Sequence, residues 1–242
     1  MAVTKRGQVS LFIIIGVVGI ILIAIYVYTR GAVTEQPEDE LLDVQPVKFY
    51  LNNCLKSSAK DAFALVGLRG GKRNLEEPYF SSNLLDTNYW YYIGEMKAVS
   101  LEDIKRNLEE ETAANLEKCF SNFLEPGLQI EKDELNISIL VFDDDTQIDA
   151  QWPINIISDS QRIHIDYTET MRLGVRLKAI HDLAENITSM VSNKKLEFGQ
   201  LIAEGMNITA DITPETQLFL ITDPKSMIDS QPYGFVFATK IK

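Results

Sequence analysis

Apolar and polar positions divide the chain into three parts: a continuous apolar run, a short acidic stretch, and a long remainder in which apolar residues recur periodically. The run extends from Leu11 to Tyr28, and no charged residue lies between Gly7 and Thr29. About 20 helical residues, each rising roughly 1.5 Å, cross the roughly 30 Å hydrocarbon core of a bilayer. The pattern therefore predicts a transmembrane helix over residues 9–29 that contacts the lipid bilayer.

The charges beside this run indicate its orientation. Lys5 and Arg6 lie in a basic segment, residues 1–8, whereas residues 30–43 form an acidic tether with little apolar content. Because positively charged flanks stay in the cytoplasm, we expect a single-pass protein of the cell membrane with a cytoplasmic N-terminus and an extracellular C-terminal domain. A cleaved secretory signal is the alternative interpretation, but the run is longer than a usual signal core and lacks a small-x-small cleavage site.

Three amphipathic helices are predicted after the tether. The first extends from Pro46, which suits a first helical turn, to Gly67. The second begins after Ser100, whose hydroxyl can cap it, and ends at Pro126. The third covers residues 173–192, where apolar residues recur at helical spacing.

Elsewhere apolar residues alternate with polar ones, which is typical of half-buried strands. The alternating segments are 137–141, 148–156, 163–167, 208–212, 217–222 and 233–241. We therefore predict an α+β domain over residues 44–242, with amphipathic helices packed on an antiparallel sheet. Within it, residues 44–126 are expected to form a mainly helical part and residues 127–242 a sheet-containing part.

The charge of the chain is strongly acidic outside the predicted membrane segment. After Arg30 there are 20 basic and 35 acidic residues, a net charge of −15. Such a surface repels phosphate backbones, so no nucleic-acid partner is expected. Hydrophobic residues make up 45% of the chain and charged residues 24%, which are ordinary values for a globular fold.

Two cysteines, Cys54 and Cys119, fall on the apolar faces of the first and second predicted helices. In an exported chain, an even pair of cysteines indicates a disulfide bond. A bridge across 65 positions would stabilise the fold by about 4 kcal/mol, because it restricts the unfolded chain. The alternative is a pair of reduced thiols in the core.

Three asparagines lie in acceptor triplets for N-glycosylation: Asn136, Asn186 and Asn207. Asn136 is offset by one position from the apolar face of its predicted strand, and Asn186 lies away from the apolar stripe of its predicted helix. We therefore expect both side chains to face solvent, as a glycan requires.

Other motifs lack the partners that catalysis or metal binding would need. The segment Gly67–Lys72 lacks the glycine spacing and the hydroxyl of a phosphate loop, and is expected to end a helix. The run Asp143–Asp145 lacks the ligand spacing of a calcium loop and predicts a hairpin turn. His164 and His181 have no evident co-ligands, and Ser57–Lys60 lies within a helix. We predict no catalytic residue, no cofactor and no metal site.

The aromatic run Tyr89, Trp90, Tyr91 and Tyr92 lies in a loop-rich stretch between the first two helices. One interpretation is an edge strand whose rings pack on the helices. The other is a contact patch for a protein partner or for self-association, because tyrosine and tryptophan dominate such contacts.

The segment Lys5-Arg6-Gly7-Gln8-Val9-Ser10, directly before an apolar helix, resembles the class III signal sequence of archaeal type IV pilin-like proteins. This resemblance covers roughly the first 30 residues and implies cleavage between Gly7 and Gln8, followed by membrane anchoring or filament assembly. Many pilins have glutamate at the fifth mature position, where this chain has Phe12. The opening is also similar to that of uncharacterised archaeal anchored envelope proteins.

These observations favour a non-enzymatic cell-envelope protein with a surface-structural or protein-interaction role. A pilin-like filament subunit is one alternative. A membrane-anchored extracellular hydrolase with an unfamiliar site is another.

Overall fold

The computed structural model describes residues 44–123, 129–157, 162–194 and 205–242, together with residues 18, 19, 21, 22, 25 and 26. Two compact units are present, Met1–Asp43 and Val44–Lys242. The predicted processing site at Gly7 and Gln8 and the tether lie outside the described residues, as does most of the predicted membrane helix. Among the described residues, no helix has both the length and the apolar character to cross a membrane.

The second unit is built around a 24-residue helix, α2 (Gln45–Leu68). It has a proline in its first turn, and a glycine pair follows its last turn. Gly70 has a positive φ of 65°, and the Gly71 N–H donates to the Val66 carbonyl at 2.9 Å, so the last turn closes as a Schellman-type cap. The predicted helix end is confirmed.

Helix α3 (Leu101–Phe120) lies beside α2. The Ser100 hydroxyl accepts a hydrogen bond from the Asp103 N–H at 3.1 Å, which confirms the predicted cap. The predicted end at Pro126 is wrong, because the helix stops at Phe120. Phe123 lies beyond the helix, yet its ring stacks on that of Phe120 with 5.9 Å between centroids, so the apolar pattern continues past the helical backbone.

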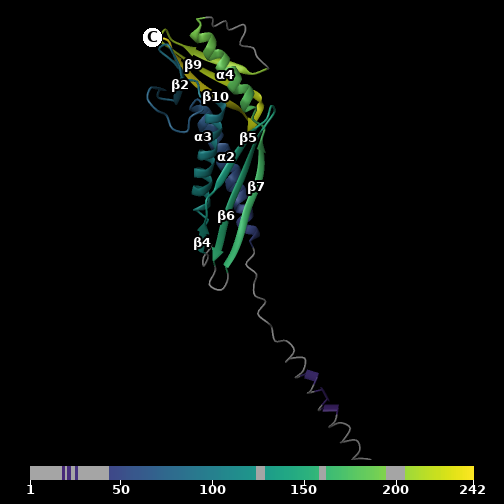
Figure 1. Cartoon of the computed structure of the whole chain (residues 1–242). Helices are drawn as coiled ribbons and strands as arrows, with labels where there is room; N and C mark the ends of the chain where they lie inside the picture. The colour runs from purple at the N-terminus through teal and green to yellow at the C-terminus, as the bar shows by residue number, and fades with distance from the viewer. Residues whose placement is uncertain are drawn as a thin grey trace, which may run out of the picture. The chain divides into compact units, whose positions relative to one another are not determined.

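A four-stranded antiparallel sheet contains β4 (Gln129–Lys132), β5 (Asn136–Val141), β6 (Thr146–Ile157) and β7 (Arg162–Leu173). β6 pairs with β7 along one side and with β5 and β4 in turn along the other. Helices α2 and α3 lie against this sheet (Figure 1). Alternate residues of β6 are buried, and the Trp152 ring meets Phe120 of α3 edge-on, so this face is the core.

The second sheet has the strand order β1 (Tyr79–Ser81), β2 (Asp86–Tyr92), β10 (Gln231–Lys240), β9 (Thr216–Ile228) and β8 (Asn207–Ile212), and the short β3 (Glu95–Met96) pairs with β2. Helix α4 (Leu177–Ser192) lies over β9, β10 and β2 (Figure 1). The α+β class is confirmed. The purely antiparallel sheet is not, because β2 and β10 run parallel.

The predicted mainly helical part, residues 44–126, contains α2 and α3 together with the short strands β1, β2 and β3. Strand β2, from the first part, lies in the interior of a sheet beside β10, from the second. Its Trp90 side chain is fully buried and contacts the rings of Phe235 and Phe237. Residues 44–242 therefore fold as one unit in which sequence-distant strands pair.

Helix α4 begins four residues later than predicted. Leu173 is the last residue of β7, and the helix starts at Leu177. The Arg176 N–H donates to the Ser226 hydroxyl at 2.9 Å, and the Met227 N–H donates to the Gly174 carbonyl at 3.1 Å. These bonds to β9 hold the connection in a non-helical path, and apolar periodicity alone does not reveal them.

Candidate functional site

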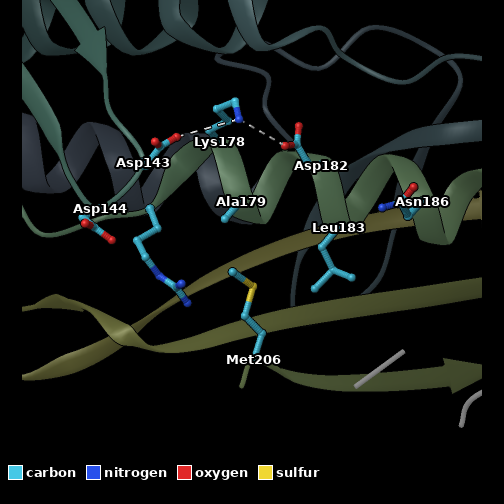
Figure 2. Close-up of a pocket in the computed structure, with 9 residues that line it drawn as sticks. Asp143, Asp144, Lys178, Ala179, Asp182, Leu183, Asn186 and Met206 are labelled. Atoms are coloured by element: carbon cyan, nitrogen blue, oxygen red, sulfur yellow. Dashed lines mark ion pairs between the residues drawn. The ribbon is translucent and has the colours of Figure 1, made fainter. Parts of the chain in front are cut away.

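A hollow of about 310 Å³ lies beside the first half of α4. We call it the α4 hollow. Figure 2 shows Lys178 and Asp182 of the helix above it, and Leu183 and Met206 on its apolar side. Its lining consists of Asp143, Asp144, Arg176, Lys178, Ala179, Asp182, Leu183, Asn186 and Met206.

Arg176, which lines the α4 hollow, belongs to a buried ion pair. Both Arg176 and Asp223 are almost fully buried, and the guanidinium binds the carboxylate in a fork, Nε to Oδ2 at 2.9 Å and Nη2 to Oδ1 at 2.7 Å. The Ser226 hydroxyl and the Lys225 N–H also donate to this carboxylate. Burial alone would raise the pKa of Asp223, but these hydrogen bonds and the Arg176 charge outweigh burial and lower it.

The rim of the α4 hollow carries a shared lysine. The Lys178 ammonium lies 3.8 Å from a carboxylate oxygen of Asp143, in the turn between β5 and β6, and 3.8 Å from one of Asp182, one helical turn along α4 (Figure 2). Asp144 also lines the hollow, so three carboxylates and the Lys178 ammonium lie among its lining groups. The rim is therefore anionic, and it can bind a polar or cationic group.

The buried His181 side chain has partners within the fold. Its Nε2 donates to the Val99 carbonyl at 2.9 Å, and its ring lies 5.7 Å from Trp90. His181, Asp182 and Glu185 bring groups of metal-binding type within 4.8 Å of one another, a cluster that the sequence analysis missed although the i, i+4 spacing of His181 and Glu185 signals it. The Val99 bond accounts for His181 and the Lys178 pairing for Asp182, and the exposed Glu185 lies 3.8 Å from the His181 Nε2.

The other predicted candidates are apart from the α4 hollow or lie in turns. His164 is exposed on β7, where it bonds to Asn155 and Asp166 at 2.9 Å each. The run Asp143–Asp145 forms the predicted turn, closed by the Phe142 N–H donating to the Asp145 carbonyl.

The predicted disulfide is confirmed. Cys54 of α2 and Cys119 of α3 are bonded, with their Cα atoms 5.7 Å apart. Cys54 is buried, so the bond lies between the two helices where they pack on each other.

The three sequon asparagines, Asn136, Asn186 and Asn207, are all exposed. Asn186 lines the α4 hollow, and Asn136 lines a separate groove on the four-stranded sheet. Asn207 opens β8, at the edge of the second sheet. The exposure agrees with the periodicity, whereas the grooves beside two of these residues arise from tertiary structure.

The aromatic run is not a surface patch as a whole. Trp90 and Tyr89 are buried, and the Trp90 Nε1 donates to the Gly70 carbonyl at 2.8 Å. Tyr91 and Tyr92 remain partly exposed and lead into a turn whose Ile93 is exposed. The physical reason is the interior position of β2, whose two faces both meet other parts of the fold.

Comparisons of the chain with protein-family models, with curated proteins and with solved structures find no match.

Proposed function

We propose that this protein is a membrane-anchored cell-envelope protein whose folded domain lies outside the cell and works through non-enzymatic protein contacts. The observation that carries the proposal is the Cys54–Cys119 bond. Structural disulfides persist in oxidising compartments and are rare in the cytosol. The apolar run at residues 9–29, with basic residues before it and acidic ones after it, supplies an anchor with this orientation.

The charge and the sequons support the same location. The part of the chain after Arg30 carries a net charge of −15, which keeps a crowded surface protein soluble and discourages contact with anionic lipid heads. The exposed Asn136, Asn186 and Asn207 side chains are accessible to glycan transfer on that side of the membrane.

The contact surface that we propose is the turn between β2 and β3 with its flanking side chains, called here the β2–β3 surface. It consists of Tyr91, Tyr92, Ile93 and Met96. Ile93 and Met96 are 51% and 53% exposed. Tyr92 also lines a shallow hollow with Pro78 and Tyr79, so aromatic and apolar groups are grouped there. Protein contacts favour such aromatic and methionine side chains.

The backbone at Ile93 gives a second reason to assign a contact there. Ile93 has a φ of 47° and Gly94 one of 91°, the pattern of a tight hairpin turn that favours Asn-Gly. A β-branched residue pays a cost in this conformation. We infer that Ile93 is kept at this strained, exposed position because its side chain contacts another protein.

Replacing Ile93 by asparagine is expected to stabilise the domain by about 1 kcal/mol, because asparagine tolerates the left-handed conformation. We expect chemical cross-linking of intact cells to give covalent adducts with the wild-type protein, and the same change to remove them. Thermal unfolding and gel mobility measure the two effects. Ile93→Val is the matched control, since valine keeps both the strain and an apolar surface. Equal cross-linking by Ile93→Asn and wild type would contradict the contact assignment.

The location is tested by labelling amines on intact cells with a reagent that does not cross membranes. We expect exposed lysines of the domain, such as Lys178, to be labelled, while Lys5 of chains that keep their first residues reacts only after the cells are broken. The proposal requires this difference because Lys5 precedes the predicted membrane segment and Lys178 follows it. Labelling of Lys5 but not of Lys178 on intact cells would show the opposite orientation, and protection of both would show an internal protein.

A further inference from the structure

The outer face of the four-stranded sheet carries a polar groove of about 450 Å³. We call it the sheet-face groove. It is lined by Asn136, Ser138, Gln147, Asp149, Gln151, Thr168 and Thr170, which offer only amide, hydroxyl and carboxylate groups. The opposite face of the same strands packs on α2 and α3, so the groove is the solvent side of the sheet.

Strand register arranges these side chains in cross-strand rows. One row runs from Asn136 on β5 through Gln151 on β6 to Thr168 on β7. The next row runs from Ser138 through Asp149 to Thr170. Neighbouring strands lie about 4.8 Å apart, so the first row extends roughly 10 Å from Asn136 across the sheet.

The two rows differ in their hydrogen bonding. Asp149 is engaged, since it accepts from the Thr170 hydroxyl at 2.7 Å and from the Gln147 amide at 3.0 Å. Among the described residues, the side chains of Gln151 and Thr168 have no hydrogen-bond partner, and both are exposed. The row that begins at the sequon asparagine therefore offers donors and acceptors for another molecule.

We propose that Asn136 carries an N-linked oligosaccharide and that its first neutral sugars lie along the row of Gln151 and Thr168. This inference rests on the proposed exterior location of the domain, where glycan transfer takes place. Sugar hydroxyl and acetamido groups both donate and accept hydrogen bonds, as do the amide of Gln151 and the hydroxyl of Thr168.

The transfer itself needs a lipid-linked oligosaccharide as donor. The side-chain nitrogen of Asn136 forms a bond to the anomeric carbon of the first sugar, while the bond from that carbon to the phosphate oxygen of the lipid carrier breaks. The bonding electrons leave with the lipid phosphate, and the asparagine amide gives up one proton. Ser138 supplies the hydroxyl of the acceptor triplet.

Because the glycan is attached at Asn136, weak contacts are enough to hold its sugars on the sheet face. A free sugar would bind an exposed polar face poorly, because each hydrogen bond replaces one to water. A tethered sugar experiences an effective concentration in the millimolar range, so even a millimolar intrinsic affinity keeps it on the face for much of the time. Asn207 lacks this arrangement, since it lies at the edge of the second sheet and lines neither groove.

The test is to express the full chain in a eukaryotic secretory host and to measure site occupancy by peptide mass spectrometry. Release by an endoglycosidase that cuts between the first two sugars is then followed on the folded protein. We expect release at Asn136 to be slower than at Asn207 by roughly threefold or more, and the two rates to become equal after denaturation. A Gln151→Ala/Thr168→Val variant should lose most of this protection. Ser138→Ala should abolish the modification.

The outcomes separate this inference from the proposed function. Occupancy of Asn207 with an empty Asn136, or equal release rates on the folded protein, would overturn the inference and leave the exterior location in place. An unmodified chain with an intact disulfide would do the same. An unmodified chain with both cysteines free would overturn both. Unchanged thermal unfolding of the Gln151→Ala/Thr168→Val variant confirms that faster release reflects lost sugar contacts.

Discussion

Replacing Cys54 and Cys119 together by serine is expected to lower the free energy of unfolding by about 4 kcal/mol. The bond closes a loop of 65 residues, and without it the unfolded chain regains the entropy that this loop restricts. The bond also joins α2 to α3, the two helices that lie against the four-stranded sheet. Since natural domains are stable by about 5–15 kcal/mol, this loss is a large part of the total.

Denaturant unfolding monitored by circular dichroism measures the effect of the bond. Adding a reductant to the wild-type protein should shift its midpoint toward that of the Cys54→Ser/Cys119→Ser variant. The variant serves as the matched control, because the same reductant should leave its midpoint unchanged. A wild-type midpoint that is insensitive to reduction would mean that the bond contributes nothing to stability.

The second large effect is expected at the buried ion pair. Asp223→Ala should destabilise the domain by about 3–5 kcal/mol, because the Arg176 guanidinium would remain buried without its carboxylate. The exposed Asp144→Ala is the matched control at the rim of the same hollow and should change stability by less than about 0.5 kcal/mol. Chemical denaturation of both variants tests the difference. Equal losses of stability in the two variants would show that the Arg176–Asp223 pair contributes no more to the fold than an exposed side chain.

A double variant, Arg176→Met/Asp223→Leu, separates the cost of burying Arg176 without Asp223 from the value of the ion pair between them. Well-packed apolar replacements of a buried ion pair are often neutral or stabilising. We therefore expect the double variant to recover most of the loss caused by Asp223→Ala. Failure to recover would point instead to the bonds that Ser226 and Lys225 make to the carboxylate.

The Asp223 carboxylate also determines in which direction the stability of the fold changes with pH. The pKa of Asp223 is lower in the folded protein than its unfolded value of about 3.9. The stabilisation by the ionised carboxylate is therefore present above about pH 4 and is lost as the pH falls through the lower folded pKa. Asp223→Asn should flatten the loss of stability in this acid range.

Many elements of the fold could be predicted from residues that lie close together in the sequence. The Ser100 cap, the glycine pair after α2 and the alternation in β5 and β6 each depend on residues within a few positions of one another. The disulfide was predictable because both cysteines fall on apolar helix faces. For the same reason, the solvent exposure of Asn136 and Asn186 followed from periodicity alone.

What the sequence did not reveal depends on long-range contacts. Ala238 of β10 pairs with Tyr89 of β2, far earlier in the chain, and this pairing places Trp90 in the core. Arg176 and Asp223 are 47 positions apart, and their bond accompanies the late start of α4. Loop closure over such distances has no short-range signal. The α4 hollow and the sheet-face groove were therefore unpredictable, although several residues that line them were singled out.

The central claim is that the domain after the apolar run folds outside the cell while its N-terminal segment remains with the membrane. Mass spectrometry of the protein isolated from native cells, alkylated without reduction, tests it most directly. We expect the protein in the membrane fraction with neither cysteine alkylated; a first residue of Gln8 would add processing of the pilin-like kind, and Met1 a plain anchor. A full-length chain in the soluble fraction with both cysteines alkylated would contradict the claim.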